Sequence, residues 1–145
     1  MERYRHVQVG WLMIVVGVIL IVCGGLFVTS SMRGADAPTL VCCGAGALMV
    51  LLFGSLTVVV HEGEVRIRFG IGLIRKRYSL SQFVKVQAVR NKWYYGWGIR
   101  WWPGCVIYNV SGLDAVELKR ADDTVVRIGT DEPEKLREAL AERMK

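Results

Sequence analysis

The residues best suited to recognition or chemistry lie in one short stretch, Asn91–Gly104, which reads NKWYYGWGIRWWPG. Six of the ten residues from Trp93 to Trp102 are aromatic, and Lys92 and Arg100 are the charged residues of the stretch. Rings mixed with cations are typical of substrate pockets, of surfaces that stack nucleic-acid bases, of packed cores and of membrane interfaces. The rest of the sequence is needed to distinguish among these four kinds of site.

The sequence contains no recognisable set of residues for catalysis, metal binding or phosphate binding. Ser79, Ser81 and Ser111 have neither a GxSxG context nor a neighbouring histidine. The two histidines lie far apart, and Cys105 is the one cysteine outside the long apolar runs, so no set of about four metal ligands is present. The Gly-x-Gly pairs lack the third glycine of a dinucleotide fingerprint. We therefore expect no catalytic residue, no metal and no cofactor, and hence no enzyme.

Two long uncharged runs dominate the N-terminal half. Val9–Val28 contains 20 residues without a charge and Ala37–Val60 contains 24, and about 20 apolar residues cross a ~30 Å hydrocarbon layer. We predict a short tail (1–8), a transmembrane helix (9–28), an external loop (29–37), a second transmembrane helix (38–60) and a soluble domain (61–145). A cleaved signal peptide is the alternative for the first run, but its apolar part would be shorter, at roughly 7–15 residues.

The flanking charges predict the orientation. Arg3 and Arg5 precede the first run, the loop carries Arg33, and five basic residues closely follow the second run. The positive-inside rule therefore places both termini and the soluble domain in the cytoplasm. The five are Arg66, Arg68, Arg75, Lys76 and Arg77.

Small residues predict that the two helices pack together. Gly10, Gly17 and Gly24 recur every seven residues on the first run, and Cys43, Ala47 and Gly54 form a second stripe. Such stripes allow close helix approach in membranes. The alternative, that glycine is simply common in membrane helices, stays open.

The soluble part alternates with the period of strands. Two strands are predicted within Val58–Gly70, and further strands over Ile74–Leu80, Gln82–Asn91, Cys105–Val110, Ala115–Arg120 and Thr124–Thr130. The aromatic stretch is predicted as a shaped loop between the fourth and fifth strands. A helix over Asp131–Lys145 presents Leu136, Ala139 and Leu140 on one face. The expected fold class is α+β: a transmembrane helical hairpin followed by an antiparallel sandwich or open barrel that this helix caps.

This order of elements resembles the bacterial pleckstrin-homology-like (PH-like) domains of small membrane proteins, which often follow a pair of transmembrane helices. The resemblance covers Gly54–Arg143 and rests on four segments: YSLSQFVKVQAVRN (Tyr78–Asn91), GWGIRWWPG (Gly96–Gly104), YNVSGLDAVELKR (Tyr108–Arg120) and VRIGTDEPEKLREAL (Val126–Leu140). It implies the bacterial cytoplasmic membrane and a protein that is not an enzyme. The fold alone implies no particular ligand.

The charge distribution favours an interaction module at the membrane. The net charge is +6, and Val65–Leu113 contains nine basic residues and no acid. We expect a scaffold or accessory subunit that binds another integral membrane protein or a second copy of itself. The alternative is a sensor of anionic lipid headgroups, with the five basic residues as lipid contacts. Nucleic acid suits a juxtamembrane domain poorly and is not expected as a partner.

The aromatic stretch is expected to form the interface with the partner or the membrane. Trp97 is expected to turn inward, and Trp101 and Trp102 are expected to form an exposed pair. The interface residues are Trp93, Tyr94, Tyr95, Trp97, Arg100, Trp101 and Trp102.

Overall fold

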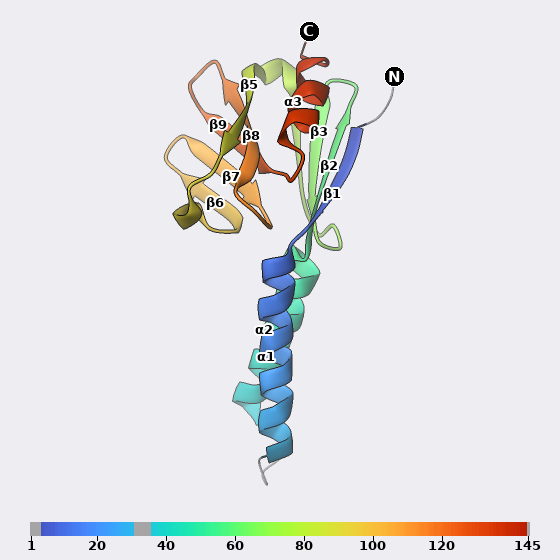
Figure 1. Ribbon diagram of the computed structural model, residues 1–145, viewed down its shortest axis with the longest axis vertical. Coiled ribbons are helices and arrows are strands. Elements are labelled where there is room, and N and C mark those ends of the chain that lie inside the picture. The colour runs from blue at the N-terminus through green and yellow to red at the C-terminus, as the bar shows by residue number, and fades with distance from the viewer. Residues whose placement is uncertain (1–3, 31–35, 145) are drawn as a thin grey trace.

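The computed structural model describes residues 4–30 and 36–144 and has an α+β fold in which a pair of helices projects from a β domain (Figure 1). The helix pair is α1 (Trp11–Ser30) and α2 (Ala37–Phe53). The remaining elements are β1 (Tyr4–Val9), β2 (Ser55–His61), β3 (Glu64–Phe69), β4 (Ile74–Ser79), β5 (Phe83–Arg90), β6 (Gly98–Trp102), β7 (Cys105–Asn109), β8 (Asp114–Arg120), β9 (Val125–Gly129) and α3 (Pro133–Ala141), with short 3-10 turns at Leu80–Gln82 and Trp93–Tyr95.

The strands form two sheets. The first has the order β1-β2-β3-β4 and is antiparallel throughout, and the second has the order β5-β8-β9-β7-β6. The expectation of purely antiparallel sheets is wrong for one pair, because β9 folds back from β8 and enters the sheet beside β7, to which it is parallel.

One hydrophobic core lies between the sheets. It joins Val58 and Ile67 of the first sheet to Leu118 and Ile128 of the second, and Leu136 of α3 is also completely buried in it. The apolar stripe of the C-terminal helix therefore covers the core, as its spacing predicts.

Aromatic rings connect the two sheets at the centre of this core. The hydroxyl groups of Tyr78 and Tyr108 lie 2.6 Å apart, and the Phe69 ring centroid lies 6.1 Å from that of Tyr108. Burial and the hydrogen bond to Tyr78 both raise the pKa of Tyr108. This phenol therefore stays neutral and contributes a satisfied polar group to an otherwise apolar core.

The predicted boundary of the second long helix is wrong. The helix was expected to continue to residue 60, but α2 ends at Phe53 and Ser55–His61 forms β2. The segment Thr57–Val60 is entirely β-branched, which favours an extended backbone. It also pairs on both sides, with β1 and with β3.

Within the predicted tail (1–8), the described residues differ from the prediction. Tyr4–Val9 forms β1 and pairs with β2 from Tyr4↔Val60 to Val9↔Ser55. The β domain is therefore built from residues that precede α1 and residues that follow α2 in the sequence.

Within the described ranges, α1 is the one helix long and apolar enough to cross a membrane, with 20 residues and a mean hydropathy of 2.8. It starts and ends two residues later than predicted. The apolar helix α2 is shorter, with 17 residues, so a transmembrane hairpin is not established by helix length. Most of the predicted external loop, including Arg33, lies outside the described residues, as does Arg3.

The aromatic stretch and β5 hold two further corrections. Gly98–Trp102, predicted as part of a loop, forms β6 at the edge of the second sheet, because its backbone pairs with β7 from Gly98↔Asn109 to Trp102↔Cys105. The regular alternation expected over Gln82–Asn91 is also interrupted, because the register of β5 shifts between Phe83 and Lys85 and leaves Val84 unpaired and 65% exposed.

Candidate interaction surfaces

Small residues let α1 and α2 approach closely, although only part of the predicted stripe takes part. A Cβ atom added at Gly17 would lie 2.8 Å from the Gly46 carbonyl oxygen, and one added at Gly24 would collide with the Cys43 sulfur. Gly46 was not among the predicted residues. Its spacing of three from Cys43, which is the spacing of one helix face, is the signal that identifies it.

The other predicted packing residues lie at the ends of this contact or beside it. A Cβ atom added at Gly10 would lie 2.5 Å from the carbonyl oxygen of Phe53, at the junction with the β domain. Gly54 follows the last residue of α2, with its N–H donated to the Val50 carbonyl. Ala47 is half-buried.

The outer face of the first sheet carries a set of arginines, which we call the arginine face. Residues directly opposite one another in an antiparallel pair share a face, and the pairing places Arg66 opposite Arg77 and Arg68 opposite Arg75. Arg66 also lies opposite Val59, whose other partner is Arg5. The arginine face therefore consists of Arg5, Arg66, Arg68, Arg75 and Arg77.

Lys76, predicted to act with these residues, lies opposite Ile67 and so belongs to the inner side of the sheet. Its register separates it from the arginines on either side of it, because successive strand residues point to opposite faces. Arg5 was not among the predicted lipid contacts, because its place on this face depends on β1.

Four members of the arginine face, Arg5, Arg68, Arg75 and Arg77, have no acidic partner among the residues that the structure describes. Arg66 pairs with Glu64 at 3.1 Å, and Arg75 donates to the backbone carbonyl of Gly72. Within the described ranges, Arg5, Arg68 and Arg77 form no ion pair. The face therefore carries an uncompensated positive charge that is available to an anionic partner.

The arginine face rises from the helix pair in two rows. The strands β1 and β2 continue from α1 and α2 (Figure 1), and the Val9↔Ser55 pair marks the junction. Arg68 pairs with Thr57, two residues beyond the junction, and the row of Arg66 lies two residues further. At about 3.4 Å per strand residue, the rows lie roughly 7 and 14 Å from the junction.

A turn between β3 and β4 is held against the end of α2. Gly70 donates its N–H to the Ser55 carbonyl at 2.8 Å, and Ile71 donates its N–H to the Leu51 carbonyl at 3.1 Å. In the same turn the side chains of Ile71 and Leu73 are 63% and 71% exposed. The turn therefore presents two apolar side chains beside the helix pair.

The residues of the aromatic stretch do not form one surface. Trp101 and Trp102 are both exposed, as predicted, but neighbouring strand residues point to opposite sides of β6, so they are not a pair on one face. Trp102 contacts the ring of Tyr95, over which the Arg127 guanidinium lies at 5.7 Å.

The remaining aromatic residues of the stretch differ in exposure. The side chains of Trp93 and Tyr94 are exposed and contact each other edge to face. Trp97 is half-buried, which agrees with the expectation that it turns inward.

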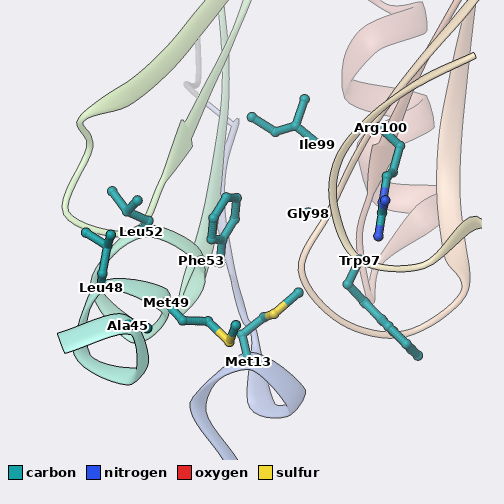
Figure 2. A pocket seen from close by; sticks show the side chains of 10 residues that line it. All are labelled: Met13, Ala45, Leu48, Met49, Leu52, Phe53, Trp97, Gly98, Ile99 and Arg100. Atoms are coloured by element: carbon teal, nitrogen blue, oxygen red, sulfur yellow. The ribbon is translucent and has the colours of Figure 1, made fainter. Parts of the chain in front are cut away.

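A groove lies where the aromatic stretch meets the helix pair, and we call it the helix–β6 groove. Its volume is about 360 Å³, and its walls are Trp97–Arg100 on one side and one face of α2 on the other, with Met13 of α1. Figure 2 shows Leu48, Leu52 and Phe53 across from Trp97 and Arg100. Arg100 is the one charged residue of this lining.

The groove could not be predicted from the sequence, because its two walls are about fifty residues apart and share no periodic signal. Of the seven predicted interface residues, only Trp97 and Arg100 contribute to it.

The second sheet holds a partly buried polar network on its outer side. Arg127 contacts Glu117 at 2.7 Å, and Glu117 also accepts a hydrogen bond from Gln87 at 2.8 Å.

Burial raises the pKa of the Cys105 thiol, which makes it a poor nucleophile. No group of three potential metal ligands occurs among the residues that the structure describes.

Neither a protein-family model nor a curated protein matches the chain. The resemblance to PH-like domains stays a prediction from the sequence.

Proposed function

We propose that the chain is a non-catalytic, membrane-anchored module of the bacterial cytoplasmic membrane, with a cytoplasmic PH-like domain that binds an acidic segment of a partner membrane protein. The observation that carries the proposal is the arginine face, where four of the five arginines lack an acidic partner within the described ranges. Arginine binds carboxylates through a planar pair of N–H groups, so an acidic peptide segment is a suitable partner.

The β1–β2 pairing supports a hairpin that crosses the membrane twice. β1 precedes α1 and β2 follows α2, yet the two strands are neighbours in one sheet. If α1 crosses a membrane, α2 has to return to the same side for these strands to pair. The 17 residues of α2 span about 26 Å at ~1.5 Å per residue, a mismatch with a ~30 Å layer that bilayers accommodate at modest cost.

The arginine face extends along the sheet away from the helix pair, which favours a protein partner over a flat lipid surface. The row of Arg66 and Arg77 lies roughly 14 Å from the helix–strand junction, so lipid charge acts on it more weakly than on the row of Arg68 and Arg75, given the ~8 Å Debye length of physiological salt. An acidic segment that lies along the sheet reaches both rows.

Site-specific photocrosslinking in native membranes tests the proposal. A photoreactive residue at Thr57, which lies in the row of Arg68 and Arg75, should give an adduct of one defined mass, and one at Gln87 on the other sheet should not. The double charge reversal R66E/R77E should abolish the adduct, and the reversal K85E on exposed β5 should leave it unchanged. An adduct that survives R66E/R77E, or its absence in wild type, contradicts the proposal. An adduct of twice the chain mass identifies a second copy as the partner in place of another protein.

The alternative, recognition of anionic headgroups, is supported by the lower row and the β3–β4 turn. Arg68 and Arg75 flank a turn whose exposed Ile71 and Leu73 lie beside the helix pair, and cations next to apolar side chains suit an anionic membrane surface. In nanodiscs, hydrogen exchange over residues 70–77 should be slower with phosphatidylglycerol than with phosphatidylcholine. R68Q/R75Q should remove that difference. Equal exchange in both lipids argues against headgroup recognition.

A further inference from the structure

We propose that the helix–β6 groove binds one molecule of an anionic lipid, with an acyl chain between the helix pair and β6 and the phosphate group at Arg100. This site is separate from the arginine face. The inference rests on the membrane-anchoring part of the proposed function, and not on the acidic partner.

The position of the groove makes a lipid chain its natural occupant. The helices that form one wall carry largely exposed apolar side chains, and only 11% of the apolar window of α1 is buried within the protein. In a bilayer these surfaces are covered by acyl chains. The groove includes Leu48, which is 54% exposed on α2, so it is continuous with that lipid-covered surface.

The lining has the chemistry of a hydrocarbon site. Every lining residue except Arg100 is apolar, aromatic or glycine, and two methionines, Met13 and Met49, lie on the helix side. Methionine side chains are flexible and adapt to irregular occupants. The volume of about 360 Å³ lies within the ~300–1,000 Å³ range of small-molecule sites. A single hydrocarbon chain therefore matches both the size and the polarity of the groove.

Arg100 gives the site its preference for an anionic lipid. Its side chain is exposed and lies close to the backbone of Gly96, and it forms no ion pair with any described residue. A guanidinium group binds a phosphate with two parallel hydrogen bonds. With one cation beside an otherwise apolar lining that includes the exposed Leu48 of α2, the groove is complementary to an amphiphile with a negative head.

Glycine at position 98 keeps the groove open on the β6 side. Gly98 has a φ of +96°, and a Cβ atom added there would lie 3.8 Å from the Phe53 ring. A side chain at this position would occupy the space between β6 and the end of α2.

Native mass spectrometry of the full chain, released from mild-detergent micelles with added lipid, tests the inference. Wild type should retain one phosphatidylglycerol several-fold more often than phosphatidylcholine of the same chain length. A45W, which fills the groove from an exposed helix position, should remove the retained lipid. L40W, at an exposed α2 position outside the groove lining, should retain it.

A second variant tests the headgroup preference of the site separately from its binding of the acyl chain. R100Q should abolish the preference for phosphatidylglycerol but still retain a lipid, because the apolar lining is unchanged. Equal retention by wild type and A45W, or an unchanged headgroup preference in R100Q, overturns the site. Far-UV circular dichroism of A45W that matches wild type shows that its lost lipid does not come from unfolding.

Carbonate extraction of native membranes distinguishes failure of this inference from failure of the proposed anchoring. A chain that resists extraction but retains no A45W-sensitive lipid overturns the groove alone. A chain that carbonate releases overturns the membrane anchoring, and the argument for a lipid in the groove with it.

Discussion

The contact between the β3–β4 turn and α2 gives a quantitative prediction at Gly70. This glycine has a φ of +49°, and a Cβ atom added to it would lie 2.8 Å from the Leu52 carbonyl oxygen and even closer to that of Leu51. The neighbouring atoms are backbone at the end of a helix, so they cannot rotate away. G70A should therefore push the turn away from α2.

The expected cost has two parts. The left-handed backbone costs a non-glycine residue about 1–2 kcal/mol. Displacing the turn also weakens two hydrogen bonds, Gly70 N–H to Ser55 and Ile71 N–H to Leu51, at about 0.5–1.5 kcal/mol each. The destabilisation by G70A should therefore be about 2–5 kcal/mol.

Gly63 provides the matched control. It also lies in a turn between two strands of the first sheet, its φ is +78°, and no atom lies within 4 Å of an added Cβ. G63A should therefore incur only the backbone part, about 1–2 kcal/mol. The gain from a stiffer unfolded chain is the same in both variants, so it cancels in the comparison.

Thermal unfolding of the full chain in mild detergent, followed by far-UV circular dichroism, measures both variants. At about 4 °C per kcal/mol for a chain of this size, the midpoint should fall by roughly 4–8 °C in G63A and about twice as far in G70A. G104A is a second control, since Gly104 has a φ of +74° and open space around it. Equal midpoints for the three variants would refute the role of the turn as a tight contact with α2.

Three further predictions test other contacts. G17A should destabilise the full chain in detergent by about 1–3 kcal/mol through overpacking between the helices, whereas G25A, with nothing within 4 Å of its added Cβ, should leave the thermal midpoint unchanged or raise it. Y4F should stabilise the chain by about 1 kcal/mol in urea unfolding at pH 7, because the buried Tyr4 hydroxyl has no hydrogen-bond partner among the described residues. Burial, followed by the nearby carboxylates, raises the pKa of Tyr4 to about 12, so the wild-type stability is complete below pH 10 and falls as the pH rises toward 12, and the advantage of Y4F should widen over that range. E117A should cost about 3–5 kcal/mol in the same assay because it leaves Arg127 without its buried partner, and E117L/R127L should recover most of that loss.

Local pattern was sufficient to predict β3, β4 and α3, but not the elements that depend on distant pairing. In β3 the alternation of Val65, Ile67 and Phe69 with Arg66 and Arg68 defines both faces, and the structure buries the three apolar residues. In β1 a similar alternation covers only six residues, and its partner strand begins about fifty residues later along the chain. No local signal marks such a pair.

The candidate surfaces were predictable to different degrees for the same reason. Arg66 and Arg68 share a face by alternation alone, but the places of Arg75, Arg77 and Lys76 depend on the β3–β4 register. That register places Arg75 and Arg77 on the same face as Arg66 and places Lys76 on the opposite face.

The placement of β1 before the helix pair and β2 after it has a consequence for how the protein is made. The first strand leaves the ribosome well before β2 (Ser55–His61) exists, so in a chain whose helices insert as proposed it waits unpaired during insertion. A chain that inserts with its N-terminus on the wrong side can never form the β1–β2 pairs, and β2 is then left as an exposed sheet edge, which favours aggregation. If the helix pair spans the membrane as proposed, closure of this sheet would act as a check on insertion, because only chains with both strands on one side of the membrane can complete the β domain.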